Sequence, residues 1–350
     1  QRIKNLLRLA AQQNASYLHL TAGRYPTFRI DGKLFPLIHE SILTPEDIKA
    51  MGDAIMSEKH KEQLLDEGQA DFSYNLEGKA RFRTNAFFQQ GFLSIAFRLI
   101  PRDIKDLKQL NLPETLYNFT KFSQGLFLAV GPVGHGKSTT LAALINEINH
   151  RQEKHIVTIE DPIEYIYEQD KCIINQREVF QDSKSFHLAL KAVFREDANV
   201  VLIGEMRDLD TISTAITAAE TGHLIFATLH TNDCPQTIDR IIDVFPAHQQ
   251  NQVRTQLAGS LLGVMSQRLV PGINGGRFPA IEIMLKNHAV ENLIREGKAY
   301  QIDNVIETSA DQGMVSMDKS LANLVRQGVV SLEDGMHYAK DQRNFQNLLR

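Results

Sequence analysis

One short glycine-rich segment constrains the fold of this 350-residue chain more than any other feature. The segment Gly131–Ser138 reads Gly-Pro-Val-Gly-His-Gly-Lys-Ser and matches the pattern G-x-x-x-x-G-K-S/T. The apolar run from Leu126 to Val130 precedes it, and an amphipathic stretch from Ser138 to Asn149 follows it. A buried strand, a glycine loop and a helix in this order predict one unit of a parallel α/β sheet.

The glycine loop is expected to bind phosphate. Glycines let the backbone curl so that several N–H groups converge on phosphate oxygens, and the helix N-terminus adds a partial positive charge. Lys137 is expected to reach the β- and γ-phosphates of ATP, and the Ser138 hydroxyl to ligate Mg²⁺. The predicted cofactor-binding residues are Gly131, Pro132, Val133, Gly134, His135, Gly136, Lys137, Ser138 and Thr139. The alternative is a glycine-rich turn that ends in Lys-Ser by chance, which leaves the flanking elements unexplained.

The apolar runs around this loop predict a parallel sheet that is covered on both faces. They span residues 126–130, 156–159, 200–203 and 224–229, and helical stretches separate them. We assign residues 116–350 to this larger domain, with mostly helical structure beyond about Pro271. Residues 1–100 read as a smaller α/β domain with a mixed sheet and two helices, and the polar, proline-containing segment 101–115 as a linker.

Composition excludes several classes of protein. Hydrophobic residues make up 43% and charged residues 23%, which is an ordinary globular balance. Cys172 and Cys234 are the only two cysteines, which argues against a disulfide scaffold. The net charge of −4 gives no basic field for nucleic acid, so no nucleic-acid partner is expected. No apolar run approaches the roughly 20 residues of a membrane-spanning helix.

Carboxylates follow two of the apolar runs. Glu205 ends the run from Val200 to Ile203, and a parallel strand's carboxyl end is where ligands bind. Glu205 is therefore the candidate for polarising the attacking water, while Gly204 occupies the place of the usual metal-bound Asp. The acidic run after residue 159 is expected to help hold the metal, and its members are Glu160, Asp161 and Glu164. A solvated charge at a strand end is the plainer reading of each.

Two histidines, His223 and His230, bracket the run from Leu224 to Leu229. A zinc site is rejected because no Cys or His pair has a structural zinc spacing. Each histidine is more often a structural hydrogen-bonding residue than a catalytic one. His230 is better placed, because it ends a parallel strand and is expected to sense the γ-phosphate.

Arginines on the strands of the smaller domain are a further candidate set: Arg81, Arg83 and Arg98. Taken alone, they form an exposed sheet face. In an oligomer, an arginine from one subunit can stabilise phosphoryl transfer in its neighbour. Competing candidates in the larger domain are Arg195, Arg207 and Arg240.

Four segments together resemble the secretion ATPase superfamily, whose signatures are the Walker A, Asp box, Walker B and His box motifs. They are Gly131–Ser138, Thr158–Glu164, Gly204–Asp208 and Thr221–Asn232. Within the superfamily the chain looks most like the PilT family of type IV pilus retraction ATPases. The segments that carry this closer resemblance are Gly-Glu-Met-Arg-Asp at 204–208, Leu18–Gly23 and Ile294–Lys298. The last resembles the retraction signature Ala-Ile-Arg-x-Gly-Lys.

The resemblance covers nearly the whole chain and implies a homohexameric ring motor. Each subunit would have a PAS-like N-terminal domain and a RecA-like ATPase domain, with ATP bound between them and closed on by arginines. Glu205 would be the catalytic glutamate and Glu164 the Asp-box acid, while His223 and His230 would couple the nucleotide site to neighbouring elements. The ring would act in the cytoplasm on an inner-membrane pilus platform protein, with a paralogous pilus ATPase as a further expected partner.

Several residues depart from the pattern of this family. Val133 and His135 replace the usual Thr and Ser of the phosphate loop, so that a titratable ring lies beside it. This predicts a nucleotide affinity that responds to pH near about 6–7. The other departures are Ala198-Asn199 for Pro-Asp, Tyr17 for Asp, and Ile294 for Ala in the retraction signature.

Other functions stay open. A PilU-like accessory retraction ATPase shares most of these segments. A pilus-assembly or type II secretion ATPase usually carries a longer N-terminal region and a four-cysteine zinc motif, which two lone cysteines do not supply. A nucleotide-gated scaffold with negligible turnover is the alternative of a different class, because of the altered loop.

Overall fold

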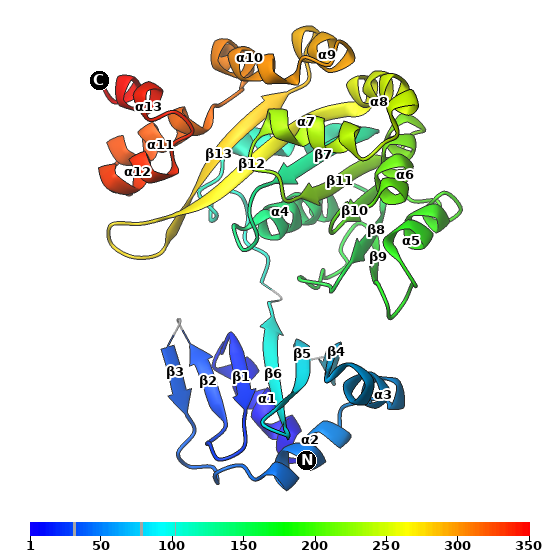
Figure 1. Cartoon of the computed structure of the whole chain (residues 1–350), viewed down its shortest axis with the longest axis vertical. Helices are drawn as coiled ribbons and strands as arrows, with labels where there is room; N and C mark the ends of the chain where they lie inside the picture. The colour runs from blue at the N-terminus through cyan, green and yellow to red at the C-terminus, as the bar shows by residue number, and fades with distance from the viewer. Residues whose placement is uncertain (31–32, 78–79, 102) are drawn as a thin grey trace. The chain divides into compact units, whose positions relative to one another are not determined.

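The computed structural model of the chain describes residues 1–30, 33–77, 80–101 and 103–350. Contacts divide them into two units (Figure 1). Unit 1 comprises Gln1–Asp103 with Glu164–Ile166, and unit 2 comprises Ile104–Ile163 with Tyr167–Arg350. Position 102 of the expected linker lies outside the described residues.

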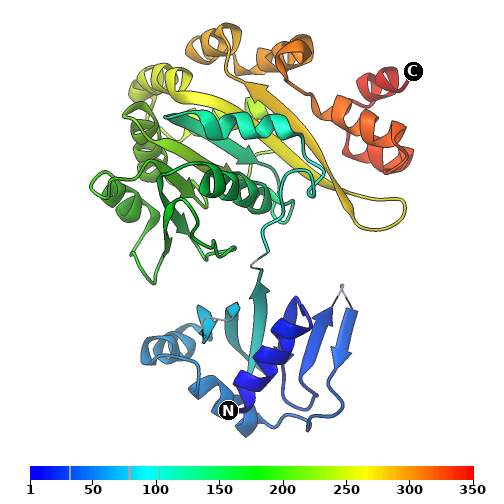
Figure 2. The same ribbon diagram turned by 180° about the vertical axis from the view of Figure 1, so that it is seen from behind.

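Unit 1 is built on a six-stranded antiparallel sheet with the order β3-β2-β1-β6-β5-β4. Its strands are β1 (Tyr17–Leu20), β2 (Thr27–Ile30), β3 (Lys33–Pro36), β4 (Gln69–Leu76), β5 (Ala80–Gln89) and β6 (Phe92–Ile100). Helix α1 (Arg2–Gln12) packs on one face, which Figure 2 shows from behind. Fully buried side chains, among them Leu7, Leu18, Phe28 and Phe97, form the core.

Unit 1 differs from the expected mixed sheet with two helices. Helix α2 (Pro45–Asp53) begins where the sequence predicts it, because Thr44 and Asp47 form a reciprocal capping box. A third helix, α3 (Glu58–Glu67), was not predicted. Leu64 is its single buried residue, so its sequence shows little of the apolar periodicity that reveals a helix.

Unit 2 contains a seven-stranded sheet with the order β13-β12-β7-β11-β10-β8-β9. The five strands β9, β8, β10, β11 and β7 are parallel, β12 runs parallel to β7, and β13 is antiparallel to β12. In chain order the elements are η1 (Glu114–Lys121), β7 (Gly125–Val130), α4 (Lys137–Arg151), β8 (His155–Glu160), β9 (Ile173–Glu178), α5 (Phe186–Val193), β10 (Val200–Ile203), α6 (Leu209–Glu220), β11 (Leu224–Leu229), α7 (Cys234–Asp243), α8 (Ala247–Ser260), β12 (Leu261–Pro271) and β13 (Arg277–Leu285). This parallel core confirms the expected α/β class.

The central strands are buried along their whole length. Every residue of β7, β10 and β11 is buried, which explains why each reads as a continuous apolar run in the sequence. Register pairs Leu229 with Val130 and Ala227 with Ile203. The carboxyl ends of these strands therefore meet at one edge of the sheet.

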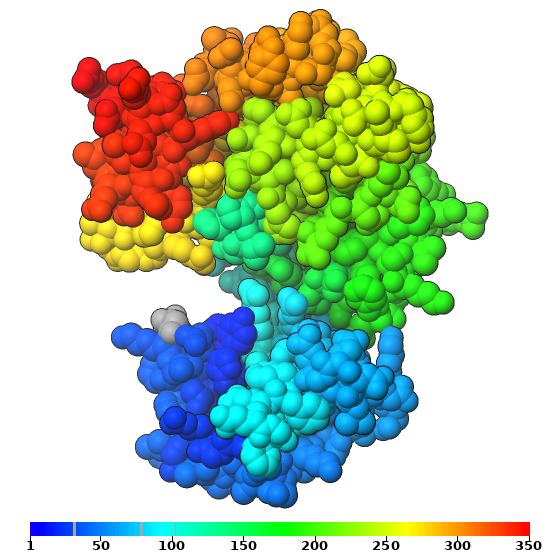
Figure 3. All heavy atoms as spheres, viewed as in Figure 1, coloured from blue at the N-terminus to red at the C-terminus, as the bar shows by residue number. Residues whose placement is uncertain are grey.

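The C-terminal part of unit 2 is helical only beyond β13. The sequence predicts mostly helix after Pro271, whereas β13 lies there and pairs with β12 over nine positions. The helices that follow are α9 (His288–Arg295), α10 (Ile302–Thr308), α11 (Met317–Arg326), α12 (Leu332–Tyr338) and α13 (Gln342–Leu349). Helices α11 to α13 pack beside the β12–β13 hairpin around Val270, Leu321 and Phe345, and Figure 3 shows them in red next to it. Among the described residues, no helix is long and apolar enough to cross a membrane.

Candidate nucleotide-binding site

The phosphate loop leaves β7 and enters α4, as the sequence predicts. Gly131, Gly134 and Gly136 have φ angles of 135°, 79° and 84°, a region that favours glycine. A Cβ on Gly131 would also lie 2.3 Å from the carbonyl oxygen of Gln267 on the neighbouring strand. The loop therefore needs glycine both for its backbone turn and for the close approach of β12.

Lys137 is the first residue of α4 and is only 6% exposed. Its Nζ donates to the carbonyl oxygens of Gly131 at 2.7 Å and Pro132 at 2.9 Å. The same Nζ lies 3.3 Å from Nδ1 of His230, which follows β11. Because an ammonium group can only donate, Nδ1 of His230 is the acceptor and Nε2 carries the proton.

His230 joins Lys137 to Glu205. Nε2 of His230 lies 3.0 Å from Oε1 of Glu205, which follows β10. Arg207 also donates to that oxygen through Nε. Lys137, His230 and Glu205 thus form one chain of contacts across the carboxyl ends of β7, β11 and β10.

The pKa of Glu205 lies below its ordinary value. Burial raises this pKa, but the hydrogen bonds from Arg207 and His230 and the charge of Arg207 outweigh burial. Glu205 is therefore ionised at neutral pH. An ionised carboxylate accepts hydrogen bonds, which is what a group that orients an attacking water must do.

Two of the predicted acidic residues lie at the same edge. Glu160 ends β8, is 7% exposed and accepts a 2.7 Å hydrogen bond from Thr158 Oγ1. Asp161 follows it and is exposed. Packing explains why Gly204 stands where a metal-binding Asp is usual, because a Cβ there would lie 3.2 Å from Glu160 Cα. Glu164 falls in the short segment that groups with unit 1.

His223 is not brought together with these groups. It precedes β11, and Leu224 pairs with Gly125 at the start of β7. Its Nδ1 lies 3.2 Å from the carbonyl oxygen of Ala218, and its ring packs edge-on against Phe194 at 5.4 Å. The six residues of β11 separate it from His230 by about 20 Å.

The arginines of unit 1 share one face of its sheet. Arg83 on β5 pairs directly with Arg98 on β6, and both side chains are exposed. Arg81 lies two residues before Arg83, so it points to the same side. Of the competing arginines in unit 2, Arg207 contacts a site residue, Glu205.

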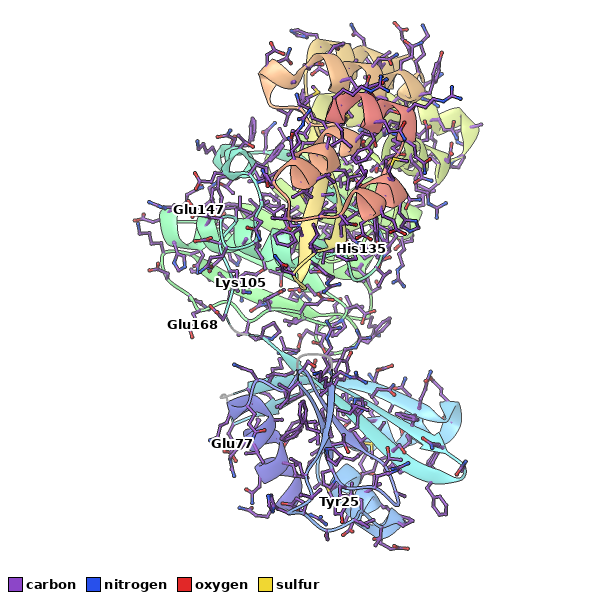
Figure 4. The ribbon with its side chains drawn as sticks, turned by 90° about the vertical axis from the view of Figure 1, so that its left-hand side faces the viewer. Tyr25, Glu77, Lys105, His135, Glu147 and Glu168 are labelled. Atoms are coloured by element: carbon purple, nitrogen blue, oxygen red, sulfur yellow. The ribbon has the colours of Figure 1, made fainter. Side chains whose placement is uncertain are left out.

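His135 contacts β12 through both its backbone and its ring, and Figure 4 labels it beside that strand. The backbone N–H of Leu269 donates to Nδ1 of His135 at 2.9 Å, and Nε2 of Gln267 donates to its carbonyl oxygen at 2.9 Å. Burial lowers the pKa of His135, and the positive charges of Arg277, Lys137 and Arg268 lower it further. The pH response predicted near 6–7 is therefore expected at lower pH.

Sequence reasoning missed Gln267 and Thr228. Gln267 is 3% exposed and touches the phosphate loop, although it lies far downstream in the sequence. Thr228 is buried in β11, and its hydroxyl donates to the carbonyl oxygen of Gly204. For Thr228 the available signal was a polar residue inside an otherwise apolar run, because a buried polar side chain needs a partner. Gln267 stands between Ser266 and Arg268, so the local sequence gives no comparable signal.

Comparison with known proteins gives the same family along nearly the whole chain. Residues 1–337 match the family of type II/IV secretion system proteins. The type IV pilus retraction ATPase PilT of Pseudomonas aeruginosa is 44% identical, over 98% of this chain and 99% of that protein. The type IV pilus ATPase PilU of the same organism is 36% identical, over 99% of this chain and 91% of that protein.

Among solved structures, the pilus retraction motor PilT with bound ADP superimposes with a TM-score of 0.92 at 46% identity. That match covers 99% of each chain. The chain therefore belongs to the family of type II/IV secretion system proteins, and it resembles the pilus retraction ATPases over nearly its whole length.

Proposed function

We propose that this chain is the subunit of an ATP-hydrolysing motor that powers type IV pilus retraction and hence twitching motility. The observation that carries the proposal is the chain of contacts from Lys137 through His230 to Glu205 at the end of the phosphate loop. It joins a phosphate-binding cation to an ionised carboxylate, the two groups that nucleotide hydrolysis needs. The similarity to PilT along almost the whole chain supports the subtype.

ATP would bind with its β- and γ-phosphates against the loop N–H groups and the N-terminus of α4. Lys137 now donates to two loop carbonyls, and it would exchange these for phosphate oxygens. Glu205 would accept a hydrogen bond from the attacking water. His230 touches both residues and would report the γ-phosphate to the glutamate.

The residues at this edge fit Mg²⁺ bound mainly by nucleotide and water. Ser138 lies in the first turn of α4, and Glu160 and Asp161 follow β8. In the described parts of the chain, no group of three or more His, Cys, Asp or Glu side chains could hold a metal alone. That agrees with a magnesium ion that takes few protein ligands and the phosphates of its nucleotide. When bound, the ion would neutralise developing phosphate charge.

The proposed working form is a homohexamer. Arg81, Arg83 and Arg98 share one face of unit 1 and would act on the nucleotide of the assembled ring. Glu164 would be the Asp-box acid. His223, which contacts Ala218 and Phe194 at the amino end of β11, would serve packing rather than catalysis. The ring would act at the cytoplasmic side of the inner membrane on a pilus platform protein, together with a paralogous pilus ATPase. Identity to PilT exceeds identity to PilU, which favours the retraction motor over the accessory ATPase.

The substitution Glu205→Gln tests the enzymatic part of the proposal. The amide keeps the shape of the side chain but loses the negative charge, so turnover of ATP should fall by about 10²–10⁴-fold. Binding of ADP should stay within about threefold, because the loop and Lys137 are untouched. Glu220→Gln is the matched control, since that carboxylate pairs with Gln256 at the far end of α6.

Steady-state turnover and ADP titration of the three proteins would distinguish an enzyme from a scaffold. Equal, negligible turnover in wild type and Glu205→Gln would leave only a nucleotide-gated scaffold. Deletion of the gene in its host then tests the subtype: excess surface pili with lost motility means retraction, whereas bald cells mean an assembly motor.

A further inference from the structure

The amide of Gln267 bridges the phosphate loop and the helix that follows it. Gln267 lies on β12, next to the point where β7 ends. Its Nε2 donates to the carbonyl oxygen of His135 at 2.9 Å, and its Oε1 accepts from Thr140 Oγ1 at 2.8 Å. Gln267 and Thr140 are both buried, so neither hydrogen bond is exchanged with water at low cost.

A second connection runs from the same strand to the same loop residue. The backbone N–H of Leu269 donates to Nδ1 of His135 at 2.9 Å. His135 is therefore held at its backbone by one residue of β12 and at its ring by another. The ring acts as an acceptor there, so its proton is on Nε2.

The loop is also shaped to admit Gln267. A Cβ on Gly136 would lie 2.7 Å from Nε2 of Gln267, and a Cβ on Gly131 would lie 2.3 Å from its carbonyl oxygen. Both glycines have positive φ. The first and last glycines of the loop thus pack directly on this one residue, and the turn between them depends on where β12 holds it.

We propose that Gln267 is a positioning residue that holds the phosphate loop in its nucleotide-binding shape. The inference rests on the proposed binding of ATP at this loop. A loop whose N–H groups already converge loses less conformational entropy on binding phosphate. The hydrogen bonds from Gln267 on β12 should therefore increase the affinity for nucleotide. Gln267 does not touch the reacting atoms; it acts through His135 and Thr140.

Strand β12 also links the loop to the C-terminal helices. Arg268, between Gln267 and Leu269, points to the opposite side and donates to the carbonyl oxygen of Tyr338 at the end of α12, at 3.4 Å. Adjacent residues of β12 therefore contact the phosphate loop and the C-terminal helix α12. A shift of β12 would move its contacts with the loop and with α12 at the same time.

The test compares Gln267→Leu, Gln267→Glu and Thr140→Val with Gln152→Leu as the matched control. The side-chain amide of Gln152 also donates a hydrogen bond to a backbone carbonyl, that of Thr120 at 2.9 Å. Gln152, however, lies at the other end of α4. Gln267→Leu removes two hydrogen bonds and should raise the Kd for ADP by about tenfold, while Gln152→Leu leaves it within about twofold. The KM for ATP should rise in parallel, with kcat at saturating ATP kept within about threefold.

Thr140→Val is a second test if Gln267→Leu does not fold. Gln267→Glu is a third test, since it keeps the acceptor for Thr140 and loses the donor to His135. Thr140→Val and Gln267→Leu together should raise the Kd for ADP by less than the product of their single effects, because they break a shared bond. Wild-type affinity in folded Gln267→Glu and Thr140→Val proteins would overturn the inference. Absence of ADP binding by the wild type would instead overturn the proposed function.

Discussion

Strand β11 has a histidine at each end, and the two lie in opposite surroundings. His230, at the carboxyl end, contacts the side chains of Lys137 and Glu205. His223, at the amino end, contacts the carbonyl oxygen of Ala218 and the ring of Phe194. The same residue type thus meets charged side chains at one edge of the sheet and a helix terminus with an aromatic ring at the other.

The difference follows from the parallel sheet. Each parallel strand ends where the next loop begins at the carboxyl edge, so the loops after β7, β8, β10 and β11 all gather there. Helix α4 also begins at that edge and turns its N-terminal N–H groups toward the loop. At the amino edge the corresponding segments connect the end of a helix to the next strand. Their residues cap the helix and pack against it.

Substituting the two histidines should give the largest contrast. His230→Ala removes the link between Lys137 and Glu205 and should lower kcat for ATP by about 10²-fold, the usual cost of losing one aligned group near developing charge. His223→Ala should leave kcat within about threefold and lower the free energy of unfolding by about 1 kcal/mol, through one hydrogen bond and one ring contact.

The two variants are compared by steady-state turnover and by urea unfolding at one pH. His230→Ala should show nearly wild-type stability, because its side chain is 37% exposed. Equal kcat in the two variants would mean that the edges of the sheet do not differ in chemistry. A large loss in His223→Ala would place the catalytic coupling at the amino edge.

Two glycines allow the carboxyl and amino edges of the sheet to be compared by their effect on stability. Gly131 and Gly222 both have φ well above zero, at 135° and 113°, so alanine is strained at either position by about 1–3 kcal/mol. A Cβ at Gly222 meets nothing within 4 Å, whereas one at Gly131 overlaps the Gln267 carbonyl oxygen. Gly131→Ala should therefore cost at least about 1–3 kcal/mol more than Gly222→Ala.

Urea unfolding of both variants measures this difference, and ADP titration adds a second readout. Gly131→Ala should also bind ADP weakly, because the loop cannot close beside β12. Equal destabilisation by the two alanines would show that the backbone conformation alone, without the approach of β12, sets the requirement for glycine at position 131.

The sequence alone predicted the carboxyl edge of the sheet, because the strand, the loop and the helix that form it are consecutive in the chain. The apolar run 126–130 is β7 (Gly125–Val130), and the stretch predicted as helix from Ser138 to Asn149 is α4 (Lys137–Arg151). Buried parallel strands are apolar throughout, and a loop motif of fixed spacing follows one of them. The sequence placed Glu205 and His230 at this edge because His230 directly follows such a run and Glu205 follows another after one glycine.

The rest depends on which strands are neighbours. Gln267 touches the phosphate loop only because β12 lies beside β7, and nothing in the local pattern sets that order. Strand β13 lies in a segment that was predicted to be mostly helical. Its partner β12 lies across a hairpin and buries most of its residues, and the local sequence does not show this pairing. His223 was grouped with His230 because the two bracket one apolar run and the family resemblance gives both a role. An extended strand nevertheless carries its two ends apart.

The smallest effect concerns protons at the carboxyl edge. The pKa of His135 lies below 6.5 in the folded chain, because burial and the nearby charges of Arg277, Lys137 and Arg268 disfavour the cation. The unfolded chain therefore binds more protons at this residue as the pH falls below 6.5, and folding loses stability over that range. Well above pH 6.5, His135 is neutral in both states and contributes no slope.

Unfolding free energies of wild type and His135→Ser between pH 5 and 8 isolate this contribution. His19 and His60 also have lowered pKa values, chiefly through burial, but both variants share them, so their slopes cancel in the difference. The difference should be flat from pH 7 to 8 and should shift in favour of His135→Ser as the pH falls below 6.5. A difference that stays constant down to pH 5 would mean that the imidazole is free to take up a proton beside the phosphate loop, and that β12 does not hold its Nδ1.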